Sequence, residues 1–115
     1  MAWTDPATGL TWAKNDNGAN VTWQQAMDYC RNLHLAGYSG WRLPAINELN
    51  SIYDANANVG GRRVKGSLHL SSWWEWSNSP GKTQQQGLCF DFSFGGRDSF
   101  QRSDNSGKRA LCVRR

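Results

Sequence analysis

Three cations fall within the six residues of GRRVKG, from Gly61 to Gly66. Arg62, Arg63 and Lys65 are interrupted by a single valine, which fits the XBBXBX pattern associated with heparin-like chains. Such cations can pair with sulfates or carboxylates along a polyanion, and an arginine can do so through two parallel N–H donors. The pattern is short and arises often by chance, so a solvated basic loop is the competing interpretation. Binding at such a loop would weaken sharply between low and high salt.

Polar and apolar side chains alternate strictly in LCFDFSF, which begins at Leu88. The alternation puts Leu88 and the three phenylalanines on one face of a strand and Cys89 on the other, so we expect Cys89 to be a surface or ligand-facing thiol. The polar face continues into GGRDSFQRSDNSGK, which is compatible with a ligand surface and equally with a solvated hairpin. The candidate ligand-facing residues of this segment are Cys89, Asp91, Ser93, Arg97, Asp98, Gln101, Arg102, Asp104 and Asn105.

Aromatic residues are numerous, with seven Trp, four Phe and three Tyr in 115 residues, whereas Leu, Ile and Val are sparse. Large aromatic side chains must therefore supply much of the buried area. Trp73, Trp74 and Trp76 offer rings that can stack on a sugar, but we expect at least two of the three to fill the core. Trp74 is the one that we include among the candidate ligand-binding residues.

Catalysis finds little support in the chain. His34 and His69 are the only histidines, and neither has a neighbouring serine or cysteine in a nucleophile motif. We expect His34 to cap a helix end or to lie on the surface. No CxxC, HExxH or EF-hand loop is present, so we expect no enzymatic activity, no metal site and no cofactor.

Charge is distributed unevenly along the chain. Residues 1–58 hold three basic and five acidic side chains, a net of −2, whereas residues 59–115 hold ten basic and four acidic ones, a net of +6. A basic half favours anionic partners, unless it serves only to keep the protein soluble. The length allows one domain with one core, spanning residues 1–115. No segment approaches the roughly 18 apolar residues of a membrane span, so we expect no membrane insertion.

A first helix is predicted over residues 21–33. Thr22 and Gln25 fit a capping box at its start. Apolar residues then repeat at helical spacing and form one face, and Gly37 ends the run. The residues of this face are Trp23, Ala26, Met27, Cys30 and Leu33.

A second helix is predicted after Pro44, with Ile46, Leu49 and Ile52 or Tyr53 facing inward. Glu48 occupies the third helical position, but Ala45 offers no side-chain oxygen to cap the start, a loss of about 1 kcal/mol. We therefore expect a helix that forms by packing and has a frayed first turn. Short strands are predicted at Trp3, Leu10–Ala13, Leu68–Trp76, Gly87–Phe94, Ser99–Arg102 and Arg109–Val113, with polar loops at 57–66, 78–86 and 102–108. The fold class is thus a single α+β domain.

Several motifs, in order, resemble the Lcl C-terminal domain family, named after the end of a collagen-like adhesin of Legionella. They are DPATGLTWAK from Asp5, the first helix, GYSGWRLPAINEL from Gly37, WEWSNS from Trp74, FDFSFGG and the ending ALCVRR. The resemblance covers nearly the whole chain. It implies a C-type-lectin-like fold, displayed outside the cell, whose ligand differs from member to member. The calcium motifs of sugar-binding animal lectins, EPN or QPD followed by WND, are absent.

The resemblance also implies a disulfide between Cys30 and Cys112, because lectin-like domains join their first helix to their last strand in this way. Such a bridge closes a loop of about 80 residues, for which the chain-entropy model gives roughly 4–5 kcal/mol. It would place the protein in an oxidising compartment. Two buried free thiols are the alternative.

We therefore expect a non-enzymatic, extracytoplasmic ligand-binding or adhesin domain that recognises anionic glycans or a host surface, since the namesake domain resembles a glycosaminoglycan-binding adhesin tip. One alternative is the variable protein of a diversity-generating retroelement, which would bind protein ligands through its C-terminal surface. Another is a structural module that trimerises or caps a fibre, which would make the chain a homotrimer. We expect no nucleic acid partner. No secretory signal precedes Trp3, so we expect Met1 to start an excised or mature domain.

Overall fold

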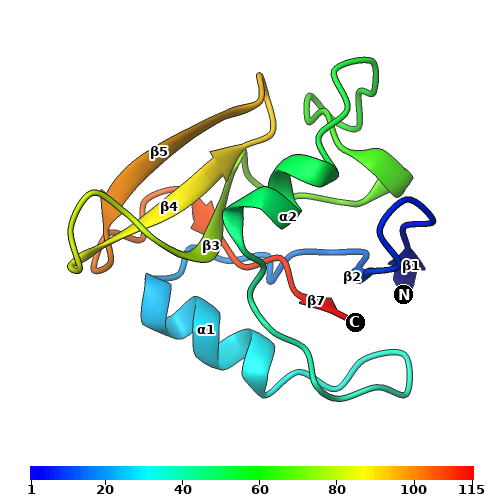
Figure 1. The fold of residues 1–115 in the computed structure, drawn as a ribbon, viewed down its shortest axis with the longest axis horizontal. Coiled ribbons are helices and arrows are strands. Elements are labelled where there is room, and N and C mark those ends of the chain that lie inside the picture. The colour runs from blue at the N-terminus through cyan, green and yellow to red at the C-terminus, as the bar shows by residue number, and fades with distance from the viewer.

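A computed structural model describes all 115 residues, and it confirms the expected α+β class. Two helices and two small sheets are connected by long loops (Figure 1). Along the chain, the elements are β1 Ala2–Thr4, β2 Thr11–Ala13, α1 Trp23–Arg31, α2 Ile46–Ser51, the 3₁₀ turn η1 Lys65–Ser67, β3 Trp74–Pro80, β4 Gln86–Asp91, β5 Gly96–Gln101, β6 Lys108–Arg109 and β7 Val113–Arg114.

The larger sheet has the strand order β5-β4-β3-β6. β3, β4 and β5 run antiparallel to their neighbours, whereas β6 pairs with β3 in parallel. In the smaller sheet, β2 lies between β1 and β7. This pairing brings the two ends of the chain close together, as Figure 1 shows.

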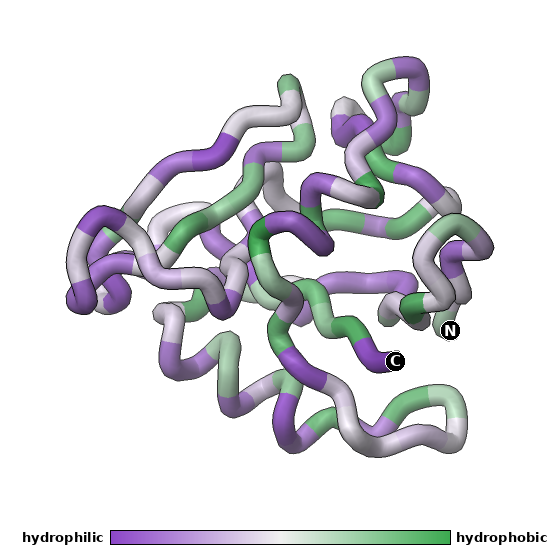
Figure 2. Tube along the Cα trace, viewed as in Figure 1, coloured by the Kyte–Doolittle hydropathy of each residue, from purple (hydrophilic) through white to green (hydrophobic).

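Strand β4 is buried on both faces. Phe90 belongs to an apolar cluster that also holds Leu49 and Ile52 at the end of α2. Its neighbour Cys89 belongs to a second cluster, which holds Ala26 of α1. Figure 2 shows the hydrophobic stretches of β4 and of the last strand on the inside of the trace. The sheet therefore separates two apolar layers, one on the α1 side and one on the α2 side.

The prediction that Cys89 faces solvent or a ligand is wrong, because this residue is 0% exposed. Alternation along a strand reveals an outward face only where one side of the sheet meets water. Here apolar residues cover both sides, and a thiol behaves as a small apolar side chain in such a place. Burial raises the pKa of the Cys89 thiol well above its ordinary value.

Strand β4 ends at Asp91, three residues before the predicted end at Phe94. Asp91 is 5% exposed, and its Oδ1 accepts hydrogen bonds from the backbone N–H and the hydroxyl of Ser93 at 2.7 and 2.6 Å. The carboxylate therefore closes the turn after β4, and the prediction that it faces a ligand is wrong. Phe94 leaves the buried face that it was expected to share with Phe90, and it is 65% exposed.

Other strand boundaries also differ from the prediction. β3 begins at Trp74, not Leu68, and runs on to Pro80, inside a predicted loop. Leu68 and Leu70 are buried in irregular backbone, because side chains of a loop can enter a core without strand pairing. β5 begins three residues early, at Gly96, and the predicted last strand divides into β6 and β7.

The capping box of α1 is confirmed. Thr22 Oγ1 accepts the Gln25 N–H at 3.3 Å, and Gln25 Oε1 accepts the Thr22 N–H at 3.0 Å. The helix buries Ala26 and Cys30, as expected, but it ends at Arg31 with Asn32 as its C-cap. The predicted extension to residue 33 is therefore wrong, since the chain already turns away at Asn32.

Cys30 and Cys112 form a disulfide, with Cα atoms 5.4 Å apart and a sequence separation of 82. Both cysteines are buried in the α1-side cluster. The bond ties the end of α1 to the end of the chain, and closing a loop of this length contributes about 4–5 kcal/mol in the chain-entropy model. Cys89 is the one free cysteine.

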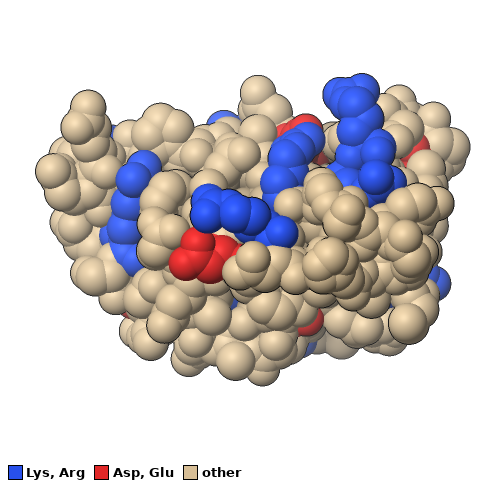
Figure 3. Space-filling view, turned by 90° about the horizontal axis from the view of Figure 1, so that it is seen from below, with Lys and Arg blue, Asp and Glu red and all other residues tan.

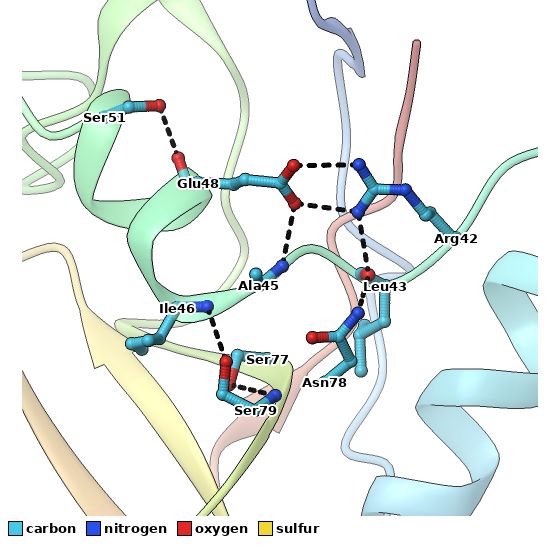
Figure 4. A network of polar contacts seen from close by, with 9 residues as sticks. All are labelled: Arg42, Leu43, Ala45, Ile46, Glu48, Ser51, Ser77, Asn78 and Ser79. Atoms are coloured by element: carbon cyan, nitrogen blue, oxygen red, sulfur yellow. Dashed lines mark hydrogen bonds and ion pairs between the residues drawn. The ribbon is translucent and has the colours of Figure 1, made fainter.

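Helix α2 buries Ile46, Leu49 and Ile52, as predicted. Its N-cap Ala45 makes no side-chain hydrogen bond, but the hydroxyl of Ser79 accepts the Ile46 N–H at 3.0 Å (Figure 4). Strand β3 thus supplies the cap oxygen that the helix sequence lacks. The expectation of a frayed first turn overlooked this contact, which joins residues 33 positions apart.

Replacing Ser79 by Ala should lower the free energy of unfolding by about 1 kcal/mol, because the Ile46 N–H loses its acceptor. Urea unfolding measures the change. Ser103→Ala is the matched control, because Ser103 is exposed and its hydroxyl makes no hydrogen bond. Adding Ala45→Ser to the Ser79→Ala variant should restore most of the loss by providing a cap within the helix itself. Equal effects of the Ser79 and Ser103 substitutions would contradict this role.

Candidate ligand-binding surface

The basic segment Gly61–Gly66 is a structured loop. Val59 and Arg62 exchange backbone hydrogen bonds of 2.8 and 3.2 Å, and they close a turn whose two central residues, Gly60 and Gly61, have positive φ values of 62° and 87°. Val64 is buried in the α2-side cluster. At the far end, a Cβ on Gly66 would come within 2.5 Å of the Trp3 ring, so only glycine fits there. The loop is therefore fixed at both ends.

The three cations of this loop have different surroundings. Arg63 is exposed and Lys65 is half-buried. Arg62 folds back: its Nη1 donates to the Gly60 carbonyl at 2.7 Å, and its guanidinium lies over the Trp73 ring, 5.5 Å from the ring centre. None of the three has a carboxylate oxygen within 4.0 Å, and the ion pairs of the protein involve other residues. Their positive charge is therefore not neutralised within the molecule.

Two aromatic side chains near this loop are exposed: Trp73, whose ring contacts Arg62, and Phe94, in the turn after β4. Trp73 is 52% exposed and Phe94 is 65% exposed. The backbone connects Trp73 to the loop through Phe92, which donates to the Trp73 carbonyl at 3.0 Å and accepts from the Arg63 N–H at 2.7 Å. Figure 1 shows the loop beside the turn between β4 and β5.

The exposed tryptophan is not the one that the sequence favoured. Trp74 is half-buried and packs edge-to-face on Phe100, with ring centres 4.9 Å apart, and Trp76 is fully buried. We expected at least two of these three tryptophans to fill the core: Trp76 does so, and Trp74 packs, partly buried, against the same cluster. Residues two apart share a face of a strand, so Trp74 and Trp76 lie on one face of β3, and this spacing was the available signal.

The predicted C-terminal surface divides into two parts. Its exposed residues are Arg97, Asp98, Gln101 and Asn105, three of them on the edge strand β5. Ser93 is half-buried in the turn after β4.

The remaining residues of that surface are engaged within the protein. Arg102 lies 3.9 Å from the Trp23 ring centre. Asp104 pairs with Lys108 at 3.3 Å, and a backbone hydrogen bond from Ser106 lowers the pKa of its carboxyl. Arg102 therefore packs against the start of α1, and Asp104 stabilises the turn that leads to β6.

The RLP signature forms a structural ion pair. Arg42 binds Glu48 through two N–H donors, at 2.7 and 2.8 Å, and Glu48 also accepts the Ala45 N–H (Figure 4). The hydrogen bonds from Arg42 hold the pKa of Glu48 below its usual range. The backbones of Arg42 and Val113 exchange two hydrogen bonds, each of 2.9 Å. This network therefore joins α2 to the last strand.

One carboxyl group is buried without a donor. Glu75 is 0% exposed, and neither of its side-chain oxygens accepts a hydrogen bond. Burial, followed by the Asp16 carboxylate, raises the pKa of Glu75 well above its ordinary value, and the positive charges of Arg109 and Arg62 only partly oppose this shift. In its protonated form, Glu75 can donate to Asp16, which removes the conflict between two buried negative charges.

Basic side chains on the α1 side of the molecule form separate groups. Figure 3, which shows the protein from below, has lysines and arginines set apart by uncharged surface, and one group has an acidic side chain directly beside it. This view shows no continuous basic track. No helix is long and apolar enough to cross a membrane, and no three His, Cys, Asp or Glu side chains lie close enough together to hold a metal ion.

A sequence profile of the Lcl C-terminal domain family matches residues 2–114. The chain therefore belongs to the Lcl C-terminal domain family. Membership in this adhesin-type family favours a non-enzymatic surface domain, and the disulfide supports an extracellular location. No curated protein of similar sequence was found.

Replacing Glu75 by Gln should stabilise the protein at neutral pH. Because its pKa is raised in the folded state, Glu75 keeps its proton there to a higher pH than in the unfolded state, which loses the proton near the ordinary value of 4.5. The wild-type stability that depends on Glu75 is thus fully present below that value and is lost as the pH rises through the folded pKa. The glutamine amide of the variant stays neutral and can still donate to Asp16.

Urea unfolding at a series of pH values measures this difference. The variant should exceed the wild type in free energy of unfolding at about pH 7 and match it near pH 3.5, where Glu75 is protonated in both the folded and the unfolded state. Asp98→Asn, which neutralises an exposed carboxylate, is the control and should shift stability by no more than about 0.5 kcal/mol. A gain from Glu75→Gln that is the same at every pH would show that the buried charge is not its cause.

Proposed function

We propose that this protein is a non-enzymatic, extracytoplasmic adhesin-type domain that binds anionic glycans through the basic loop Gly61–Gly66. The observation that carries the proposal is a fixed loop whose three cations have no carboxylate partner. A site of this kind attracts sulfates and carboxylates without first breaking an internal ion pair.

Fixed geometry strengthens the proposal. A flexible loop would lose conformational freedom when it closed on a ligand, whereas this loop is already held by backbone bonds and by the burial of Val64. Arg63 is the exposed member, and Lys65 extends from the same segment, so both are placed to contact a ligand.

We also propose that the domain has a C-type-lectin-like fold. It is supported by the pairing of the chain ends through β1, β2 and β7, and by the disulfide from α1 to the end of the chain. Lectin-like domains use such a closed scaffold to display ligand-binding loops.

A second candidate function is protein recognition through a diversified surface. It is favoured by the exposed polar residues Arg97, Asp98 and Gln101 on the edge strand β5. A reverse transcriptase with a template repeat beside the coding sequence would support this candidate. A third candidate is a structural module that caps a fibre as a homotrimer. A trimer in solution that binds no ligand would support it.

The double variant Arg63→Ala/Lys65→Ala tests the loop. It should weaken binding to a heparin oligosaccharide by about tenfold or more, the effect of losing at least one charge-assisted contact. It should also flatten the dependence of affinity on salt, because fewer ions are displaced on binding. Isothermal titration calorimetry at several salt concentrations measures both effects.

Lys82→Ala/Arg115→Ala is the matched control. It also removes one lysine and one arginine, both exposed and without side-chain hydrogen bonds, at sites outside the loop. Diffuse attraction to the basic half predicts equal losses from the two double variants, and that result would reject the loop as the site. Stability should change by no more than about 0.5 kcal/mol in either variant.

A further inference from the structure

The exposed aromatic rings beside the basic loop are held in place. The Arg62 guanidinium covers Trp73 and is itself anchored to the Gly60 carbonyl. Such a cation–π contact restrains a ring that is otherwise half in solvent. Trp73 is therefore presented as a fixed surface.

Phe94 is held in place by close packing against glycine backbone. A Cβ on Gly96 would come within 2.4 Å of the Phe94 ring, and a Cβ on Gly95 within 2.7 Å of the Tyr53 ring. The two glycines thus let both rings lie directly against the turn between β4 and β5. Phe94 is packed against the backbone even though 65% of its surface is exposed.

The backbone links Trp73 to Arg63 through a single residue. Phe92 donates to the Trp73 carbonyl, and Arg63 donates to the Phe92 carbonyl. Both Trp73 and Arg63 are exposed, so this link places an indole and a guanidinium on the same part of the surface.

We propose that Trp73 and Arg63 form a two-part subsite for an acidic sugar, in which the indole stacks on the C–H face of a pyranose ring and the guanidinium binds a sulfate or carboxylate. This inference rests on the proposed glycan binding and deepens it, because it requires a sugar ring beside the negative charge. A polyanion without rings would contact only the cations and would gain nothing from the indole.

Trp73→Ala is the first test. The ligands are a heparin-derived octasaccharide and an inorganic polyphosphate of matched charge, and calorimetry gives the Kd of each. The substitution should weaken octasaccharide binding by roughly five- to tenfold, the size of an aromatic contact converted to affinity. Polyphosphate binding should change less than about twofold. Arg63→Ala should weaken the binding of both ligands.

Two further variants support this comparison. Trp73→Phe keeps an aromatic ring, so it should retain most of the octasaccharide affinity, and it serves if Trp73→Ala folds poorly. Tyr29→Ala removes an exposed aromatic residue from α1 and should leave the binding of both ligands unchanged.

The outcomes separate the two proposals. If the wild type does not bind the octasaccharide, the proposed glycan binding is rejected, and the subsite with it. If Arg63→Ala weakens binding but Trp73→Ala does not, the basic loop is upheld and the aromatic subsite is rejected. Equal losses of octasaccharide and polyphosphate in Trp73→Ala would also reject stacking, because the indole would then act only through the position of the loop.

Discussion

The burial of β4 on both faces is the constraint on which the other parts of this fold depend. Neighbouring residues Cys89 and Phe90 enter different apolar clusters, so each face of the strand needs its own cover. Helix α1 covers one face and α2 the other, and the disulfide at Cys30 fixes α1 to the end of the chain. Polar groups carried into this interior, such as Glu75, must be neutral or paired there.

The candidate binding surface lies where this buried framework meets solvent. Trp73 directly precedes β3, and Phe94 lies in the turn after β4. The basic loop is joined to the same end of these strands by the hydrogen bond from Arg63 to the Phe92 carbonyl. A rigid framework thus fixes cations and aromatic rings relative to one another, although they come from separate segments of the chain. Such preorganisation reduces the entropy that a ligand must overcome on binding.

Local patterns in the sequence were sufficient wherever the structure is local. The capping box of Thr22 and Gln25 and the inward face of α2 could be predicted because a helix is set by residues three and four apart. The solvent-facing assignment of Cys89 failed because alternation carries no information about what packs on the second face. The Ser79 cap and the exposed ring of Trp73 depend on contacts between distant segments, which a single sequence does not display.

Thiol labelling of Cys89 tests the two-sided burial of β4 most directly. A buried thiol with a raised pKa should react with an aromatic disulfide reagent only when the protein opens, so its rate should rise with urea in parallel with unfolding. A variant that combines Cys89→Ala with Ser103→Cys provides the rate of an exposed thiol on the same scaffold. The two-layer core predicts labelling of native Cys89 that is far slower than this reference. Labelling at the reference rate without urea would contradict it.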